Sequence, residues 1–308
     1  MGSAGGRTGV LLAILVTATA LLLRVSSGGA QSAAEPCARA PTPGDSEIML
    51  ESGGVQRTAI LHVPPAPAGQ RMPLLVALHG AGGKFFAPYS GFSTLADAEG
   101  FIALYPDPLE ENAGRTYWNI DQAPRGPDDV QFIADLLDYV EDELCVDASR
   151  VYAAGVSNGG GMAALLACQL SERFAAIASI AGGYASLPPC QPANPVSVIE
   201  VHGSADTVVP DDGTPPDGAG AVGPFLAAWR ERDGCQGRPR VSRIAPRVER
   251  FLWSHCAQGT AVERVEVFGG GHQLPGALPP DPGQASTFSA PWLVWSYLRQ
   301  QRKLTPAP

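Results

Sequence analysis

Short apolar runs rich in β-branched residues recur along this 308-residue chain and alternate with segments of helical periodicity. A strand that is buried on both faces is apolar throughout, because neither of its sides meets water. We therefore expect strands at residues 58–63, 74–78, 101–105, 151–154, 176–180, 196–201 and 264–268.

The clearest helical pattern covers residues 127–144, where apolar side chains recur at three- and four-residue spacing. Asp128 and Asp129 stand at its beginning, where a carboxylate caps the first backbone NH groups and complements the helix dipole. Further helices are expected at residues 158–170, 223–232 and 290–303. Strands that alternate with helices predict an α/β fold with a mainly parallel central sheet and helices on both faces.

The first thirty residues differ in composition from the rest. Arg7 precedes a predominantly apolar run over residues 10–23, and small residues follow at 26–30. This layout predicts a signal peptide over residues 1–30 with cleavage before Gln31, and hence a secreted protein, extracellular or periplasmic. A membrane anchor is the alternative, but the run is shorter than the roughly 20 residues that cross a bilayer. We expect no stable anchor.

The segments after the predicted signal peptide differ in character. Residues 31–46 are rich in Ala, Pro and small polar side chains, so we expect an extended lead-in there. Residues 47–304 are expected to form a single catalytic domain. The Pro- and Gly-rich stretch 209–223 is interpreted as a surface loop near the site.

Acidic residues outnumber basic ones, 30 to 21, and residues 1–30 hold two Arg and no acidic residue, so the exported chain would carry a formal charge of −11. That charge disfavours nucleic acid as a partner, because its phosphates would be repelled. An even number of cysteines after residue 30 suits an oxidising compartment, and the absence of a Cys-Xaa-Xaa-Cys pair disfavours structural zinc. They are Cys37, Cys145, Cys168, Cys190, Cys235 and Cys256.

The strongest chemical signal is Gly155-Val156-Ser157-Asn158-Gly159, which lies between a predicted strand and a predicted helix. In that context it predicts a nucleophile elbow, the tight turn that exposes a serine hydroxyl at the carboxyl end of a strand in the α/β-hydrolase fold. Ser157 is the candidate nucleophile. A chance Gly-Xaa-Ser-Xaa-Gly turn is the alternative.

A serine hydroxyl needs a histidine that accepts its proton and an acid that orients the histidine. Of the five histidines, His272 stands in a glycine-rich loop after the last predicted strand, where it could reach the elbow. Asp206 is the first carboxylate after the strand at 196–201 and lies between serine and histidine in chain order. Asp211 and Asp212 are the fallback acids, and a solvent-exposed loop histidine is the alternative for His272.

An oxyanion hole is expected from backbone NH groups. Asn158 follows the nucleophile and supplies one donor, and Ala81, in the loop after the strand at 74–78, supplies the second. The same glycine-rich loop lacks the Gly-Lys-Ser/Thr ending of a P-loop, so a nucleotide site is not expected.

Four blocks occur in a fixed order: HGAGG at 79–83, GVSNGG at 155–160, HGSADTVVP at 202–210 and GGGHQLPG at 269–276. Together they resemble the secreted esterase family that unites feruloyl esterases with polyhydroxybutyrate depolymerase-like proteins, over about residues 45–300. The resemblance implies a Ser157, Asp206 and His272 triad and ester hydrolysis through an acyl-enzyme, without a metal or organic cofactor. It also suggests that Trp118 lines the substrate pocket, with core packing as the alternative.

The family resemblance implies, as substrate, a feruloyl or acetyl ester of plant polysaccharide or a short hydroxyalkanoate ester. A serine peptidase on the same fold and a non-catalytic secreted binding protein are the alternatives. For the cysteines we expect Cys145–Cys168, because the elbow strand and the following helix run antiparallel. Cys235–Cys256 and Cys37–Cys190 would then complete the set.

Overall fold

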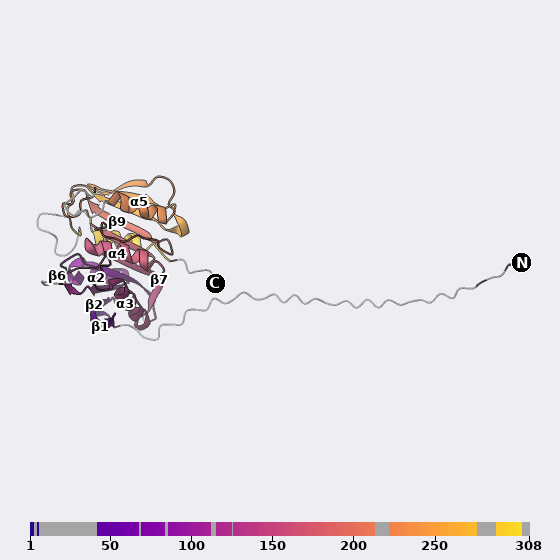
Figure 1. Cartoon of the computed structure of the whole chain (residues 1–308), viewed down its shortest axis with the longest axis horizontal. Helices are drawn as coiled ribbons and strands as arrows, with labels where there is room; N and C mark the ends of the chain where they lie inside the picture. The colour runs from indigo at the N-terminus through magenta and orange to yellow at the C-terminus, as the bar shows by residue number, and fades with distance from the viewer. Residues whose placement is uncertain are drawn as a thin grey trace. The chain divides into compact units, whose positions relative to one another are not determined.

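The computed structural model describes residues 42–67, 69–83, 86–111, 115–124, 126–212, 222–275 and 288–303, together with residues 1, 2 and 5. Within these residues ten strands form one sheet in the order β1-β2-β4-β3-β7-β8-β9-β12-β11-β10. In Figure 1, β1 and β2 are labelled at one end of the fold and β9 lies toward the other. The strands are β1 (Gly44–Ser52), β2 (Val55–Val63), β3 (Met72–Leu78), β4 (Ile102–Asp107), β7 (Val146–Val156), β8 (Ala176–Ile180), β9 (Ser197–Gly203), β10 (Arg240–Ala245), β11 (Val248–Trp253) and β12 (Val262–Val267).

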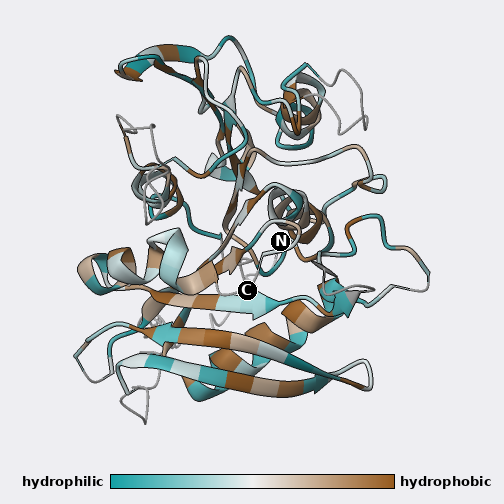
Figure 2. Ribbon diagram, turned by 90° about the vertical axis from the view of Figure 1, so that its left-hand side faces the viewer, coloured by the Kyte–Doolittle hydropathy of each residue, from teal (hydrophilic) through white to brown (hydrophobic). Residues whose placement is uncertain are grey.

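The middle of the sheet is parallel. Each neighbouring pair from β4 through β3, β7, β8 and β9 to β12 is parallel, and antiparallel strands flank this block on both sides. β3, β8 and β9 are buried at every position and are mainly apolar, and Figure 2 shows long hydrophobic stretches, drawn brown, in the strands of the sheet. Because parallel strands end on the same edge of a sheet, the loops after β3, β7, β9 and β12 lie along one edge.

Helices cover both faces of the sheet, as the alternating pattern predicts. α3 (Asp129–Glu143), α4 (Asn158–Gln169) and α5 (Val222–Arg232) pack on one face, and α2 (Phe92–Glu99) and α6 (Ala290–Leu298) on the other. The shorter elements are α1 (Phe86–Ser90), the 3₁₀ turn at Ala257–Gly259, and the two-stranded sheet of β5 (Glu110–Glu111) and β6 (Arg115–Thr116). The Asp128 side chain accepts a hydrogen bond from the Gln131 NH, so the expected N-cap of α3 is confirmed.

Three sheet strands, β1, β10 and β11, were not expected from the sequence. Their side chains are largely exposed or half-buried, so they lack the continuous apolar run that marks a buried strand. β1 begins at Gly44, within the expected lead-in, whereas residues 31–41 lie outside the described residues. The expected signal peptide also lies outside them, apart from residues 1, 2 and 5.

Two disulfides join described residues, Cys168–Cys190 and Cys235–Cys256. The second was expected. Since Cys168 bonds to Cys190, the expected Cys145–Cys168 and Cys37–Cys190 pairs are wrong; Cys145 is disulfide-bonded, and Cys37 lies outside the described residues.

The position of Cys145 explains the error in the expected pairing. Its carbonyl accepts a hydrogen bond from the NH of Met72, the first residue of β3, whereas α4 leads to β8 on the other side of β7.

None of the helices within the described ranges is long and apolar enough to cross a membrane.

Candidate active site

Ser157 occupies a tight turn between β7 and α4, as the sequence predicts. Its backbone has φ 57° and ψ −120°, a conformation that residues with a side chain rarely adopt. The Ser157 NH donates to the Ile180 carbonyl at 2.9 Å, and its carbonyl accepts from the Gly161 NH at 3.1 Å. The neighbouring strand and the first turn of the helix therefore hold this strained residue in place.

The glycines on either side of Ser157 allow this turn to form. A Cβ at Gly155 would lie 2.0 Å from the Gly159 carbonyl oxygen, and a Cβ at Gly159 would lie 2.4 Å from the Leu78 carbonyl oxygen. Any side chain at these two positions would overlap backbone atoms. Glycine at both positions therefore relieves the crowding of the turn.

Asp206 and His272 are directly hydrogen-bonded. His272 Nδ1 lies 2.8 Å from Asp206 Oδ2, and the Asp206 side chain is fully buried while that of His272 is 20% exposed. The two loops also meet through the backbone, because the Ala205 NH donates to the Gly270 carbonyl at 2.9 Å. A carboxylate acceptor at Nδ1 fixes the hydrogen there and leaves Nε2 free to accept a proton.

The other oxygen of Asp206 anchors the turn that follows β9. Asp206 Oδ1 accepts hydrogen bonds from the NH groups of Val208 at 2.8 Å and Val209 at 2.9 Å. Both carboxylate oxygens are therefore engaged, one by the backbone and one by His272. The fallback acid Asp211 instead pairs with Arg264 at 2.8 Å.

The glycine-rich loop after β3 lies directly beside Ser157. A Cβ at Gly80 would lie 3.2 Å from Ser157 Cβ, so a side chain there would be crowded against the nucleophile. Thr116 stabilises the loop, since its carbonyl accepts from the Gly82 NH at 2.6 Å and its hydroxyl donates to the Gly83 carbonyl at 2.7 Å. Ala81, the expected second oxyanion donor, is an exposed residue of this loop.

Asn158 begins α4, where the backbone NH groups of the first turn have no partner within the helix. Its side chain exchanges two hydrogen bonds with the Trp118 backbone, at 2.7 and 3.1 Å. Trp118 itself is fully buried and donates its Nε1–H to the His79 carbonyl at 3.0 Å. Trp118 therefore packs in the core and supports the glycine-rich loop, which corresponds to the packing alternative rather than to an exposed pocket wall.

Glu200 and His202 are two site residues that the sequence reasoning did not identify. His202 Nδ1 lies 2.7 Å from Glu200 Oε1, its Nε2 lies 3.4 Å from Asp206 Oδ2, and all three side chains are fully buried. A signal was present in the sequence, because Glu200 and His202 are charged or polar positions in an otherwise apolar strand. Such residues are almost never buried unless they are paired.

A cavity of about 610 Å³ lies near the same edge of the sheet. Phe86, Tyr105 and Thr116 contribute to its wall, together with the carboxylates of Asp107 and Glu110. Thr116 connects it to the glycine-rich loop through the hydrogen bonds described above. None of the candidate reactive residues lines this cavity, and Thr116 is its link to the loop beside Ser157.

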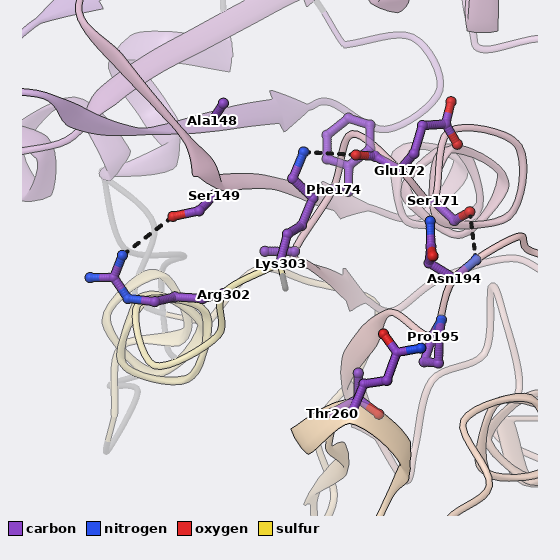
Figure 3. A pocket seen from close by; sticks show the side chains of 12 residues that line it. Ala148, Ser149, Ser171, Glu172, Phe174, Asn194, Pro195, Thr260, Arg302 and Lys303 are labelled. Carbon is purple, nitrogen blue, oxygen red and sulfur yellow. Dashed lines mark hydrogen bonds between the residues drawn. The ribbon is translucent and has the colours of Figure 1, made fainter. Parts of the chain in front are cut away.

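A second cavity, of about 240 Å³, lies at the opposite edge of the sheet (Figure 3). Its wall includes Ser149 near the start of β7, Phe174 before β8 and Pro195 before β9. Lys303 crosses it and donates to the Glu172 carbonyl at 2.7 Å. It is lined by none of the candidate site residues.

In the part of the chain that the structure describes, no three His, Cys, Asp or Glu residues are grouped so that they could hold a metal ion.

Comparison with known proteins gives a family match. Residues 58–187 match the family model described as "Esterase PHB depolymerase". Feruloyl esterase D of Neurospora crassa is 30% identical over 302 residues, which cover 91% of this chain and 95% of that protein. Feruloyl esterase B of Piromyces equi is 31% identical over 70% of this chain, but the match spans only 42% of that longer protein.

Among solved structures, the acetyl xylan esterase from Aspergillus awamori is similar to this chain with a TM-score of 0.56 and 17% sequence identity. The match covers 77% of this chain and 96% of that structure. At this level of identity the likeness establishes the α/β-hydrolase fold.

Proposed function

This chain belongs to the Esterase PHB depolymerase family, and on that premise we propose that it is a secreted serine hydrolase that cleaves carboxylic esters through an acyl-enzyme. The observation that carries the proposal is the 2.8 Å hydrogen bond between His272 and buried Asp206, at the same edge of the parallel sheet as the strained turn at Ser157. Two disulfides support the secreted location, since such bonds persist in oxidising compartments.

In the proposed reaction, the Ser157 hydroxyl oxygen attacks the ester carbonyl carbon while His272 Nε2 takes the hydroxyl proton. The NH groups of Asn158 and Ala81 stabilise the oxyanion. The tetrahedral intermediate collapses, the ester C–O bond breaks, and His272 returns the proton to the departing alcohol. Water then repeats the sequence on the acyl-enzyme and releases the acid, which restores Ser157.

For the substrate we propose feruloyl or acetyl esters of plant polysaccharide, or short hydroxyalkanoate esters. Feruloyl esterases and an acetyl xylan esterase are among the similar proteins. The 610 Å³ cavity supports a substrate with a bulky, hydroxyl-rich alcohol part, because the carboxylates of Asp107 and Glu110 can accept hydrogen bonds from sugar hydroxyls. Tyr105 and Phe86 add apolar surface for a sugar ring or an aromatic acid.

The central test is the Ser157→Ala variant. We expect the wild-type protein to hydrolyse p-nitrophenyl acetate and the variant to lose at least about 10³-fold in kcat/KM, because the nucleophile is removed. Ser46→Ala, at an exposed serine of β1, is the control and should hydrolyse the ester like the wild type. Activity retained in Ser157→Ala would contradict the assignment of the nucleophile.

Substrate comparison separates the remaining possibilities. Release of ferulate from methyl ferulate, acetate from acetylated xylan or hydroxybutyrate from its oligomers would identify the acyl group. A peptidase on this fold would instead cleave acyl-peptide anilides faster than the esters. A binding protein would turn over none of these compounds, and a fluorophosphonate probe would leave Ser157 unlabelled.

A further inference from the structure

We propose that His202, held by Glu200, is a positioning residue that sets the geometry and the electrostatic environment of the Asp206–His272 pair. This inference rests on the proposed function, because it concerns how the same site is tuned. It assigns a role to two buried polar residues that the proposed reaction does not use.

The position of the hydrogens on His202 follows from its partners. Nε2 lies 2.8 Å from the Val209 carbonyl oxygen, which can only accept a hydrogen bond, so Nε2 must carry a hydrogen. Nδ1 lies 2.7 Å from Glu200 Oε1. Both ring nitrogens are therefore engaged, and the imidazole is held from both sides.

His202 closes the turn that carries Asp206. Val209 donates its NH to Asp206 Oδ1 at 2.9 Å and accepts from His202 Nε2 at 2.8 Å. One residue of the turn is thus bonded to both side chains. A shift of His202 would release the Val209 carbonyl and, with it, one of the two NH groups that fix the Asp206 carboxylate.

His202 also acts on the oxygen that binds His272. Asp206 Oδ2 lies 2.8 Å from His272 Nδ1 and 3.4 Å from His202 Nε2. Burial alone lowers the pKa of His202, but the hydrogen bond and charge of Glu200, the Val209 carbonyl and Asp206 together raise it to about 9. At neutral pH the His202 ring is therefore a positive imidazolium, 3.4 Å from the Asp206 oxygen that binds His272.

Other charged groups surround Glu200 and His202, and they act mainly on the pKa of Glu200. Burial raises the pKa of Glu200, whereas His202 and then Arg264 lower it and Asp211 raises it. The Tyr184 hydroxyl donates to Glu200 Oε1 at 3.3 Å, and Ser179 contacts the same hydroxyl at 2.7 Å. On β12, Arg264 is paired with Asp211 at 2.8 Å and with Glu266 at 3.3 Å, so its charge is largely balanced locally.

The consequence for the reaction is electrostatic. When His272 takes the proton from Ser157 it becomes positive and is stabilised by Asp206. A positive His202 behind Asp206 repels the positive charge that forms on His272 during the reaction, so Glu200 and His202 set how strongly the Asp206 carboxylate stabilises that charge. The negative charge of Glu200 lies behind His202 and compensates only in part.

Glu200→Gln is the sharpest test, because glutamine has nearly the same shape. Its amide can donate to Nδ1 of a neutral His202, which preserves the Nε2–H contacts with Val209 and Asp206 but removes the charge. We expect the acid limb of the kcat/KM profile for p-nitrophenyl acetate to move to higher pH by about half a unit, with little change in KM. An unchanged midpoint, or a shift to lower pH, would overturn the proposal.

His202→Gln tests the geometric part of the role. Loss of the imidazole should lower kcat by about 10-fold to 100-fold while KM changes little, because Asp206 loses its support but the substrate surface does not. The matched control is His62→Gln. His62 lies on strand β2 and also contacts two carboxylates, Asp45 at 2.6 Å and Asp97 at 3.1 Å. A loss no greater than in the control would contradict the geometric role.

The outcomes also separate this inference from the proposed function. A wild-type protein without ester hydrolysis would contradict the proposed function. Hydrolysis by the wild type with an unchanged acid limb in Glu200→Gln would contradict only the role of His202. If His202→Gln fails to fold, the Glu200→Gln profile decides the question by itself.

Discussion

At the scale of single residues, Asp206 is the most constrained side chain of the candidate site. Its Oδ1 binds two backbone NH groups, and its Oδ2 meets His272 and His202. The backbone bonds determine which oxygen faces His272. The carboxylate can therefore select one tautomer of that ring without moving itself.

This arrangement predicts the effect of Asp206→Asn. The asparagine oxygen would keep the NH groups of Val208 and Val209, and its amide NH₂ would face His272 Nδ1. The ring hydrogen must then move to Nε2, which can no longer accept the Ser157 proton. We expect kcat to fall by about 10³-fold to 10⁴-fold, as the corresponding change does in serine proteases, with KM nearly unchanged in steady-state assays.

The control for this change is Asp138→Asn, which alters an exposed carboxylate bonded to Arg173 at 2.7 Å, away from the candidate site. It should keep activity within about twofold of the wild type. A fall of less than tenfold in Asp206→Asn would show that His272 does not depend on Asp206.

At the scale of elements, the site depends on where β7, α4 and β9 are fixed relative to one another. α4 begins directly after Ser157, and Cys168 near its end is bonded to Cys190, in the segment before β9. The Asn194 NH also bonds to the Ser171 hydroxyl at 3.2 Å in the same region. These links attach the helix of the nucleophile to the strand that leads to Asp206.

Removing this link should lower stability by a predictable amount. The Cys168–Cys190 and Cys235–Cys256 bridges span 22 and 21 residues, so each should stabilise the fold by about 3 kcal/mol through its effect on the unfolded chain. We expect Cys168→Ala/Cys190→Ala and Cys235→Ala/Cys256→Ala to lose similar free energies of unfolding in urea titrations. Losses that differ by more than about 1 kcal/mol would contradict an effect set by loop length.

At the scale of the whole molecule, two buried carboxyl groups at the other end of the sheet affect stability. Asp233 and Glu263 are almost fully buried, and burial raises the pKa of each to about 7, although the Val196 NH and then Arg232 partly offset this for Asp233. In the unfolded chain both would titrate near pH 4. The folded protein therefore binds more protons than the unfolded chain between about pH 4 and 7.

The sign of the pH dependence follows directly. The contribution of these two groups to the free energy of unfolding is greatest below about pH 4 and is lost as the pH rises through about 7, at about 1.4 kcal/mol per pKa unit and group. Asp233→Asn/Glu263→Gln should reduce the difference in stability between pH 5 and pH 8 by about 2 kcal/mol or more, measured by urea unfolding. Asp138→Asn, at an exposed carboxylate, is the control, and an unaltered difference in the double variant would refute the assignment.

Local sequence patterns were sufficient to predict the central strands of the sheet and the turn at Ser157. The seven apolar runs became the six strands of the parallel block and β2 beside it, because strands buried on both faces carry mainly apolar residues. The elbow at Ser157 was predictable because its glycines have a local cause. A side chain at Gly155 would overlap the Gly159 backbone, and one at Gly159 would overlap the backbone at the end of the neighbouring strand β3. Chain order and strand ends were enough to select Asp206 and His272, which the structure joins by a hydrogen bond.

Other features depended on contacts between distant segments. The flanking strands β1, β10 and β11 carry no continuous apolar run, so only their pairing identifies them. The partner of Cys168 depends on which side of β7 each segment lies, and the backbone of the buried Trp118 bonds to the Asn158 side chain, 40 residues away. The same holds for His202: the strand pattern places it near Asp206, but only the folded turn brings Val209, Asp206 and Glu200 around its ring.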